Sequence, residues 1–412
     1  MERKLLSAQT ILPISSKPIY YSSVYLENGK IAEIGPTDSL LKKYKNVKHN
    51  DLGKGILLPG FVNAHTHLEL GWITEHIGGF GSFIDWIKQI ISAKKNHTPT
   101  ENKIRDSVNN GIRRLIKSGT TTVAEISSFE GVDKEPLKNC FLRTIVFSEV
   151  FDRHSKDIEK IKLEKSELYE ERLFPHAPYS CSPDTLSKVH KYCLKNEESF
   201  GIHLAESQQE SLFINNKNNH FEKSIYPLLG KEKFSRKKAS TPLEYMIKNK
   251  FFDGVRVSAV HMVHVLEHEL QIIKENDIGV ILCPRSNKFL NVGLPPVKLY
   301  KELQRVGLGT DGVSSNLNLD MFEEISFFYL TFREIIGEEM AQFAVYVATL
   351  GGAKALFIED EVGSIEPGKA ADLIFICPQN YYKDPYLTVV SSTRSELTMS
   401  MVNGEILFSP IN

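Results

Sequence analysis

The sequence lacks the cysteine content of a disulfide-stabilised or thiolate-metal protein. Its 412 residues include only five cysteines, which are scattered and form no C-x-x-C pair: Cys140, Cys181, Cys193, Cys283 and Cys377. An odd, dispersed set argues against a disulfide framework and against a thiolate zinc site, and it is typical of a reducing compartment. We therefore expect a cytoplasmic protein.

Long apolar runs and an excess of one charge are also missing. No stretch approaches the ~20 apolar residues that span a bilayer, and the N-terminal segment shows no long apolar region with a cleavage site typical of a signal peptide. The 50 basic and 51 acidic side chains leave a formal net charge of −1, which provides no general attraction to nucleic acid or anionic membrane. We expect a small-molecule substrate and no nucleic-acid or membrane partner; the sequence leaves the oligomeric state open, with a homodimer as the candidate.

The two ends of the chain resemble each other and differ from the middle. Alternating apolar and polar residues flank Asn28-Gly29 and again Asn403-Gly404, the strongest short signal for a two-residue hairpin. Because one hairpin alone is marginally stable in water, the two ends are expected to pack together. We predict a small composite β-sandwich domain formed by residues 1–56 and 360–412.

The middle of the chain, residues 57–359, alternates between short apolar runs and stretches with helical spacing. One helical stripe combines Ile104, Val108 and Ile112. About eight such strand–helix units predict an α/β fold, a closed (β/α)8 TIM-like barrel. An open doubly wound sheet is the alternative, and it is weakened because no G-x-G-x-x-G motif follows the first run.

Histidines stand at the end of the first apolar run of the predicted barrel. His65 and His67 close the segment ILLPGFVNAHTH. Residues i and i+2 of a strand point to the same side, so both imidazoles can reach one metal ion. An isolated H-x-H is about as often a pair of ordinary histidines, and the spacing alone leaves both interpretations open.

Further polar residues follow later runs in the same way. His203 and Glu206 lie in GIHLAES, His261 lies in VSAVH, and Asp311 lies in LGTDG. Each is weak alone, because a buried histidine, a solvated glutamate or a simple turn explains it equally well; for His264, three residues after His261, we favour a structural role. At the ends of runs one, five, six and eight, however, they would converge on the C-terminal mouth of a barrel.

These motifs together resemble the amidohydrolase superfamily over nearly the whole chain, in the branch of cytosine, guanine and adenosine-type deaminases. The resemblance rests on the segments LLPGFVNAHTHLEL, GIHLAES, AVHMVHV, LCPRSN, LGTDGVSSN and GSIEPGKAADLI. It implies four metal ligands: His65, His67, His203 and Asp311. It also implies Glu206, His261 and Asp311 as catalytic residues. No lysine ends the third or fourth run to serve as a bridging carbamate, so one divalent ion is implied, zinc first and iron as the alternative.

The resemblance also addresses the substrate. The segment FPHAPYSCS is similar to one that contacts the nucleoside in such deaminases, which implies substrate binding by His176 beside Glu206. Glu69, next to the H-x-H, either faces the ligand or forms a surface ion pair. The motifs are most similar to the 6-aminodeoxyfutalosine deaminases of menaquinone biosynthesis, which release ammonia from the 6-amino position. Alternatives are a deaminase of S-adenosylhomocysteine or methylthioadenosine, a chlorohydrolase of a related ring, and, more remotely, a non-catalytic scaffold.

Overall fold

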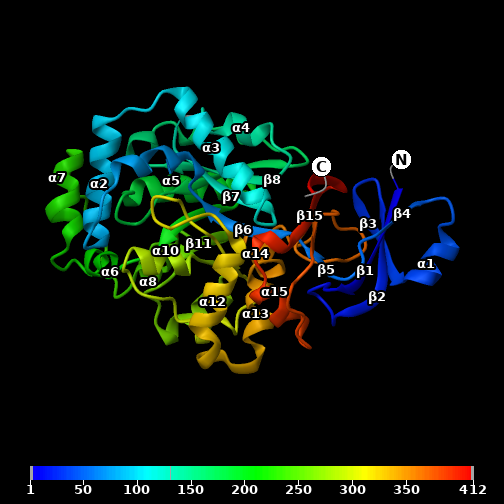
Figure 1. The fold of residues 1–412 in the computed structure, drawn as a ribbon. Coiled ribbons are helices and arrows are strands. Elements are labelled where there is room, and N and C mark those ends of the chain that lie inside the picture. Colours follow the sequence, from blue (N-terminus) through cyan, green and yellow to red (C-terminus); the bar gives the residue numbers. More distant parts are fainter. Residues whose placement is uncertain (1–2, 130, 410–412) are drawn as a thin grey trace.

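Strands from both ends of the chain form one mixed sheet. The structure is a computed structural model that describes residues 3–129 and 131–409, and Figure 1 shows the N-terminal strands (blue) beside the C-terminal strands (orange and red) at one side of the barrel. The strands hydrogen-bond in the order β16-β15-β14-β5-β1-β2-β3, with β4 on β1. Their bounds are β1 Arg3–Ile11, β2 Ile19–Glu27, β3 Lys30–Pro36, β4 Lys48–Asp51, β5 Ile56–Pro59, β14 Leu373–Ile376, β15 Leu397–Val402 and β16 Glu405–Phe408.

Both predicted hairpin turns are present, and they touch each other. Asn28 and Gly29 have φ of 53° and 76°, and Asn403 and Gly404 have φ of 47° and 79°, the left-handed values that a two-residue hairpin of this type requires. A Cβ on Gly29 would lie 2.7 Å from the carbonyl oxygen of Asn403, so a side chain there would separate the two turns. The two ends therefore pack together as expected, while the domain limits given above stay a prediction.

The second sheet contains eight parallel strands in sequence order, from β6 to β13. Their bounds are β6 Phe61–Thr66, β7 Thr120–Ser127, β8 Arg143–Val150, β9 Tyr169–Pro175, β10 Phe200–Leu204, β11 Val257–His261, β12 Gly279–Leu282 and β13 Val306–Leu308. The first and last strands meet where Asp311 N donates to His65 O at 3.0 Å. Here Gly309 permits the approach, because a Cβ on it would lie 2.8 Å from His65. The predicted barrel with a separate sheet is confirmed.

Helices connect the barrel strands and cover the barrel. The predicted stripe of Ile104, Val108 and Ile112 is buried on α3, which begins after the capping residue Thr100. The helices are α1 Thr37–Lys43, α2 Phe83–Asn96, α3 Glu101–Ile116, α4 Lys134–Lys138, α5 Pro183–Asn196, α6 Gln208–Ile214, α7 Tyr226–Leu229, α8 Pro242–Lys248, α9 Leu270–Glu275, α10 Pro284–Phe289, α11 Val297–Tyr300, α12 Met321–Ile336, α13 Met340–Val347, α14 Leu350–Ala355 and α15 Pro385–Ser391. No helix in the described part of the chain has the length and hydropathy needed to cross a membrane.

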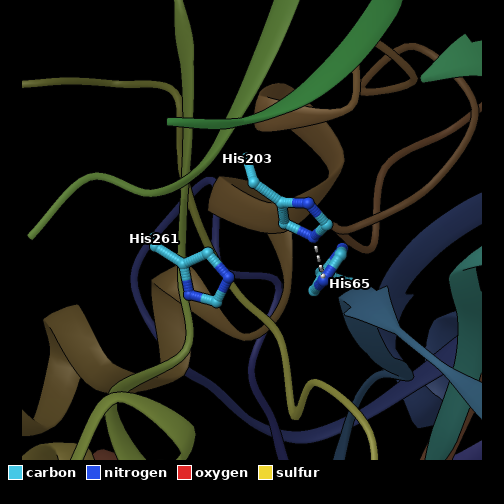
Figure 2. A group of neighbouring side chains, drawn as sticks. All are labelled: His65, His203 and His261. Atoms are coloured by element: carbon cyan, nitrogen blue, oxygen red, sulfur yellow. Dashed lines mark hydrogen bonds between the residues drawn. The ribbon is translucent and has the colours of Figure 1, made fainter. Parts of the chain in front are cut away.

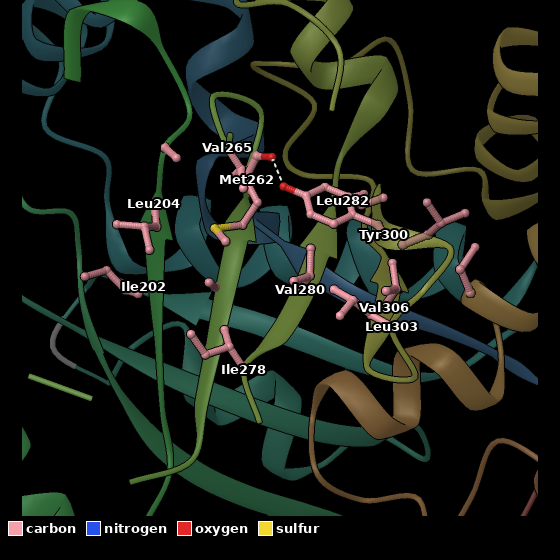
Figure 3. Packing of buried hydrophobic residues seen from close by; sticks show 14 of the residues in the cluster. Ile202, Leu204, Met262, Val265, Ile278, Val280, Leu282, Tyr300, Leu303 and Val306 are labelled. Carbon is pink, nitrogen blue, oxygen red and sulfur yellow. Dashed lines mark hydrogen bonds between the residues drawn. The ribbon is translucent and has the colours of Figure 1, made fainter. Parts of the chain in front are cut away.

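Alternate residues of the barrel strands face opposite sides, and this alternation divides the core. On β12, Val280 and Leu282 pack in the large cluster between strands and helices, together with Ile202 and Leu204 of β10 (Figure 3). Ile281, between them, belongs to the smaller cluster that includes inward-facing residues of the other barrel strands. The barrel is therefore filled with side chains, and polar groups collect where its strands end.

Candidate active site

Five predicted side chains converge at the C-terminal mouth of the barrel. His65 Nε2 lies 3.3 Å from His203 Nε2, and Figure 2 shows the rings of His65, His203 and His261 gathered together. Asp311 Oδ1 lies 3.8 Å from His65 Nε2 and 4.0 Å from His67 Nε2. The groups His65–His203–His261 and His65–His67–Asp311 each have their ligand atoms within 4.8 Å of one another.

Strand geometry places His203, and departures from it place His261 and Asp311. His203 lies between Ile202 and Leu204, which face the outer core, so its ring points into the barrel. Val260 belongs to the inner cluster, and regular alternation would turn His261 outward. Instead, His261 has φ of 76° and Asp311 has φ of 59°. A non-glycine residue in this region costs on the order of 1–3 kcal/mol, which surrounding contacts must offset.

In each of three histidines, a hydrogen bond at Nδ1 fixes the orientation of the ring. His67 Nδ1 lies 3.0 Å from Glu69 Oε1, His203 Nδ1 lies 3.0 Å from the carbonyl of His176, and His261 Nδ1 lies 2.9 Å from Asn287 Oδ1. Each partner is an acceptor, so Nδ1 is the donor in each pair, and Nε2 is left facing the centre, where a metal ligand must present it without a proton.

The carboxylate of the centre, Asp311, is held by α10, the helix that follows the seventh barrel strand. Ser286 Oγ donates to Asp311 Oδ2 at 2.6 Å, and Gly312 N donates to Oδ1 at 2.7 Å. The predicted ligands are the imidazoles of His65, His67 and His203 and the carboxylate of Asp311. Three imidazole nitrogens and one carboxylate oxygen form a donor set that suits a divalent ion such as zinc. The residues present therefore fit the metal that the resemblance implies.

Burial controls the charge of these histidines and of Glu206. It lowers the pKa of His65 and of His203 well below the ordinary value, so both rings are neutral at pH 7, as metal ligands must be. Burial also acts to lower the pKa of His67, but the Glu69 carboxylate outweighs it and raises that pKa to about 9. For Glu206, burial and the nearby Asp311 raise the pKa well above the ordinary value.

Glu206 sits on a turn that Glu210 organises. The carboxylate of Glu210 accepts the backbone N–H groups of Ala205 at 3.1 Å and Glu206 at 3.0 Å, and Ala205 has φ of 53°. Glu206 Oε1 then lies 3.6 Å from His261 Nε2. Our sequence analysis missed Glu210, although the segment SQQE carries the spacing of a helix capping box.

The converging groups line a cavity of about 510 Å³. With the exception of His65, every predicted site residue lines it: His67, Glu69, His176, His203, Glu206, His261 and Asp311. Apolar side chains of α2 and α7 and of the turn before α7 form the outer wall: Phe83, Trp86, Ile87, Ile90, Ile91, Ile225 and Leu229. His264 does not line it and bonds through Nε2 to the carbonyl of Val292 at 2.9 Å, consistent with a structural role.

A second residue that the sequence analysis missed, Glu125, supports the turn that follows His67. Glu125 on β7 is fully buried and accepts the N–H of Leu68 at 2.8 Å and of Glu69 at 3.2 Å. It also accepts the hydroxyl of Thr66. These bonds fix the turn that follows the H-x-H. A charged residue inside the apolar run TTTVAEI was the available signal for it.

Comparisons with known proteins identify the family and similar folds. Residues 56–407 match the amidohydrolase family. The chain is 29% identical to a 5-methylthioadenosine/S-adenosylhomocysteine deaminase of Thermodesulfovibrio yellowstonii, covering 97% of this chain and 92% of the relative. Its fold is similar to Helicobacter pylori aminofutalosine deaminase in complex with methylthio-coformycin (TM-score 0.84, 24% identity, 98% and 100% of the two chains). It is also similar to an adenosine deaminase from Xanthomonas campestris with bound zinc (TM-score 0.80, 23% identity, 98% and 93%).

Proposed function

Because the chain belongs to the amidohydrolase family and is thus a hydrolase of C–N bonds, we propose that it deaminates the 6-amino group of an adenine-type nucleoside. The observation that carries this proposal is the grouping of Glu206, His261 and Asp311 beside three further histidines at the inner end of one cavity. Deamination of a purine ring needs an acid, a base and an activated water at one carbon, and this grouping can supply them.

We assign His65, His67, His203 and Asp311 as the ligands of one divalent ion, zinc ahead of iron. The donor set supports zinc, and so does the zinc-bound adenosine deaminase of similar fold. When bound, such an ion supplies Lewis acidity, which makes water a usable nucleophile near neutral pH.

The protein groups then move the protons of the reaction. Asp311 accepts a proton from the attacking water, and His261 orients that water through the lone pair of Nε2, because Asn287 holds the Nδ1 proton. Glu206, protonated because of its raised pKa, donates to ring N1. The Glu206 carboxylate then takes the remaining proton of the attacking oxygen and passes it to the amino group, which departs as ammonia and leaves the 6-oxo product. Transfer of the Asp311 proton back to Glu206 restores both groups.

The outer cavity bears on which nucleoside is used. Its apolar wall from α2 and α7 is accompanied by the cationic side chains of Lys94 and Arg153. A nucleoside with a large substituent on the 5′ carbon fills such a cavity better than adenosine does. Our first candidate is therefore 6-aminodeoxyfutalosine, which would place the enzyme in menaquinone biosynthesis. The second is S-adenosylhomocysteine or methylthioadenosine, supported by the name of the 29% identical relative.

A substrate panel tests this proposal. We expect ammonia release from 6-aminodeoxyfutalosine at a kcat/KM at least about tenfold above that for adenosine, as loss of one or more substituent contacts predicts. Methylthioadenosine, S-adenosylhomocysteine and a chlorotriazine complete the panel. Higher kcat/KM for either sulfur nucleoside would favour the second candidate. Turnover of the chlorotriazine alone would contradict deamination and indicate a chlorohydrolase.

His176 is proposed to bind the substrate without binding metal. Its Nδ1 lies 2.7 Å from Ser180 Oγ, its ring lines the cavity, and burial lowers its pKa to about 3, so the ring is neutral. We expect His176→Ala to lower kcat/KM for the nucleoside by roughly 3- to 100-fold, the effect of losing one hydrogen bond. The backbone carbonyl that holds His203 is retained in this variant.

Metal content, Tm and kcat/KM for adenosine and free adenine check the prediction. A recognition role predicts unchanged metal and Tm, with a smaller loss for adenine if the ring contacts the sugar. Equal losses on both substrates together with a lowered Tm would instead make His176 a packing residue.

A further inference from the structure

Three neighbouring strands end in polar side chains that the metal centre does not account for. Glu69 follows β6, Ser128 follows β7, and Glu149 lies on β8. Because β6, β7 and β8 are adjacent in the barrel sheet, the three side chains form one wall of the cavity, and all three line it. The wall lies on the side of His67 and His176.

This wall has more hydrogen-bond acceptors than donors. Glu69 Oε1 takes bonds from His67 Nδ1 and from Ser128 Oγ at 3.1 Å, while Glu69 Oε2 is buried without a partner. The Glu149 side chain is 6% exposed, and it lies 3.9 Å from His176 Nε2, beyond hydrogen-bond distance. Burial raises the pKa of Glu149 to about 7, although the charges of Lys94, His67 and Arg153 act to lower it. A buried acceptor without a donor, such as Glu69 Oε2, is costly, so the wall favours a ligand that brings donors.

The position of the wall limits which part of a ligand reaches it. Glu69 hydrogen-bonds His67 directly, so the wall begins beside the reaction centre, and it extends through Glu149 toward Lys94 and Arg153, whose charges act on the Glu149 carboxyl. In a nucleoside, the group next to the reacting ring is the ribose, which carries two adjacent hydroxyls. A vicinal diol delivers two donors to two neighbouring carboxylates at once.

We propose that Glu69, Ser128 and Glu149 form a subsite for a vicinal diol, the 2′ and 3′ hydroxyls of the substrate ribose. The inference rests on the proposed nucleoside deaminase function and adds Glu149 as a specificity-determining residue. Glu69 Oε2 and the Glu149 carboxylate accept from the two hydroxyls, and Ser128 holds the other oxygen of Glu69. Glu149 is the residue to vary, because among the described residues it forms no hydrogen bond or ion pair with a proposed metal ligand, although its charge acts on His67.

Deoxynucleosides test the subsite on the unsubstituted enzyme. Adenosine, 2′-deoxyadenosine, 3′-deoxyadenosine and free adenine are compared on the metal-loaded enzyme. We expect each deoxy compound to lose roughly 10- to 100-fold in kcat/KM against adenosine, the effect of a hydrogen bond to a charged group. Equal kcat/KM for adenosine and both deoxy compounds would overturn the subsite while leaving deamination intact. No ammonia from any adenine nucleoside would overturn the proposed function and the subsite together.

Glu149→Gln then identifies the residue. We expect kcat/KM for adenosine to fall roughly 10- to 100-fold, mainly through KM, with much smaller changes for one deoxy compound and for adenine. Glu164→Gln, which alters an exposed carboxylate outside the cavity, serves as the matched control and should change none of these values. Equal losses on all four substrates would contradict diol recognition. If the unsubstituted enzyme binds a second metal ion per chain and Glu149→Gln loses that ion, the subsite binds a cation and the diol proposal is wrong.

Discussion

Replacing Glu206 with glutamine is expected to remove nearly all turnover while leaving metal content and substrate affinity unchanged. Glutamine keeps the size and hydrogen-bonding ability of the side chain but cannot give up and recover a proton. Acid–base help of this kind is worth roughly 10²–10⁴ in rate, and the same carboxyl serves both ring N1 and the leaving amine. We expect kcat to fall by at least about 10²-fold.

Single-turnover rates, substrate affinity by calorimetry and elemental analysis check this prediction. Glu275→Gln, on the exposed side of α9, provides a control for the substitution itself. Turnover within a few-fold of the unsubstituted enzyme would show that Glu206 has a structural role. Its contact with His261 at 3.6 Å would then be a packing contact.

Removing the metal is expected to abolish activity, and about one ion per chain is expected to restore it. Three imidazoles and one carboxylate suit a single ion with an open position. Binding should also raise Tm, because a ligand at about 1,000 times its Kd stabilises the native state by roughly 4 kcal/mol. Chelation, zinc titration and Tm measurement on the same preparation test both parts.

A pair of histidine variants provides the control for the metal experiment. His203→Ala removes a proposed ligand and should lose the ion, whereas His264→Ala removes a histidine that lies outside the cavity and bonds to Val292. His264→Ala should keep one ion per chain. Two tightly bound ions in the unsubstituted protein, or full activity without metal, would rule out the proposed centre.

Much of the architecture follows from local patterns. The Asn28-Gly29 and Asn403-Gly404 turns need left-handed backbone, which few other residue pairs tolerate, so two hairpins could be placed from the sequence. The alternation of apolar runs with helical stripes predicted the parallel barrel. The order of histidines and Asp311 at the ends of those runs then pointed to its C-terminal mouth.

The supporting residues could not be found in this way. Glu210, Glu125 and Asn287 look like ordinary polar residues in the sequence, and only their bonds to Glu206, Glu69 and His261 give them a place in the site. Glu149 is similar: a carboxylate within an apolar run signals something unusual, but not what it faces. Such roles depend on pairs of residues brought together by the fold.

The sequence by itself determined which residue types stand at which strand ends, because strand alternation and turn chemistry act over a few neighbouring residues. Only the tertiary structure decided which atoms of those residues meet. His261 points inward through a φ of 76°, against the alternation of its strand. Ser286 on α10, which follows the seventh strand, orients Asp311 after the eighth strand. Barrel closure brings these distant segments within hydrogen-bond distance, and the bonds formed there hold backbone conformations that no local pattern favours.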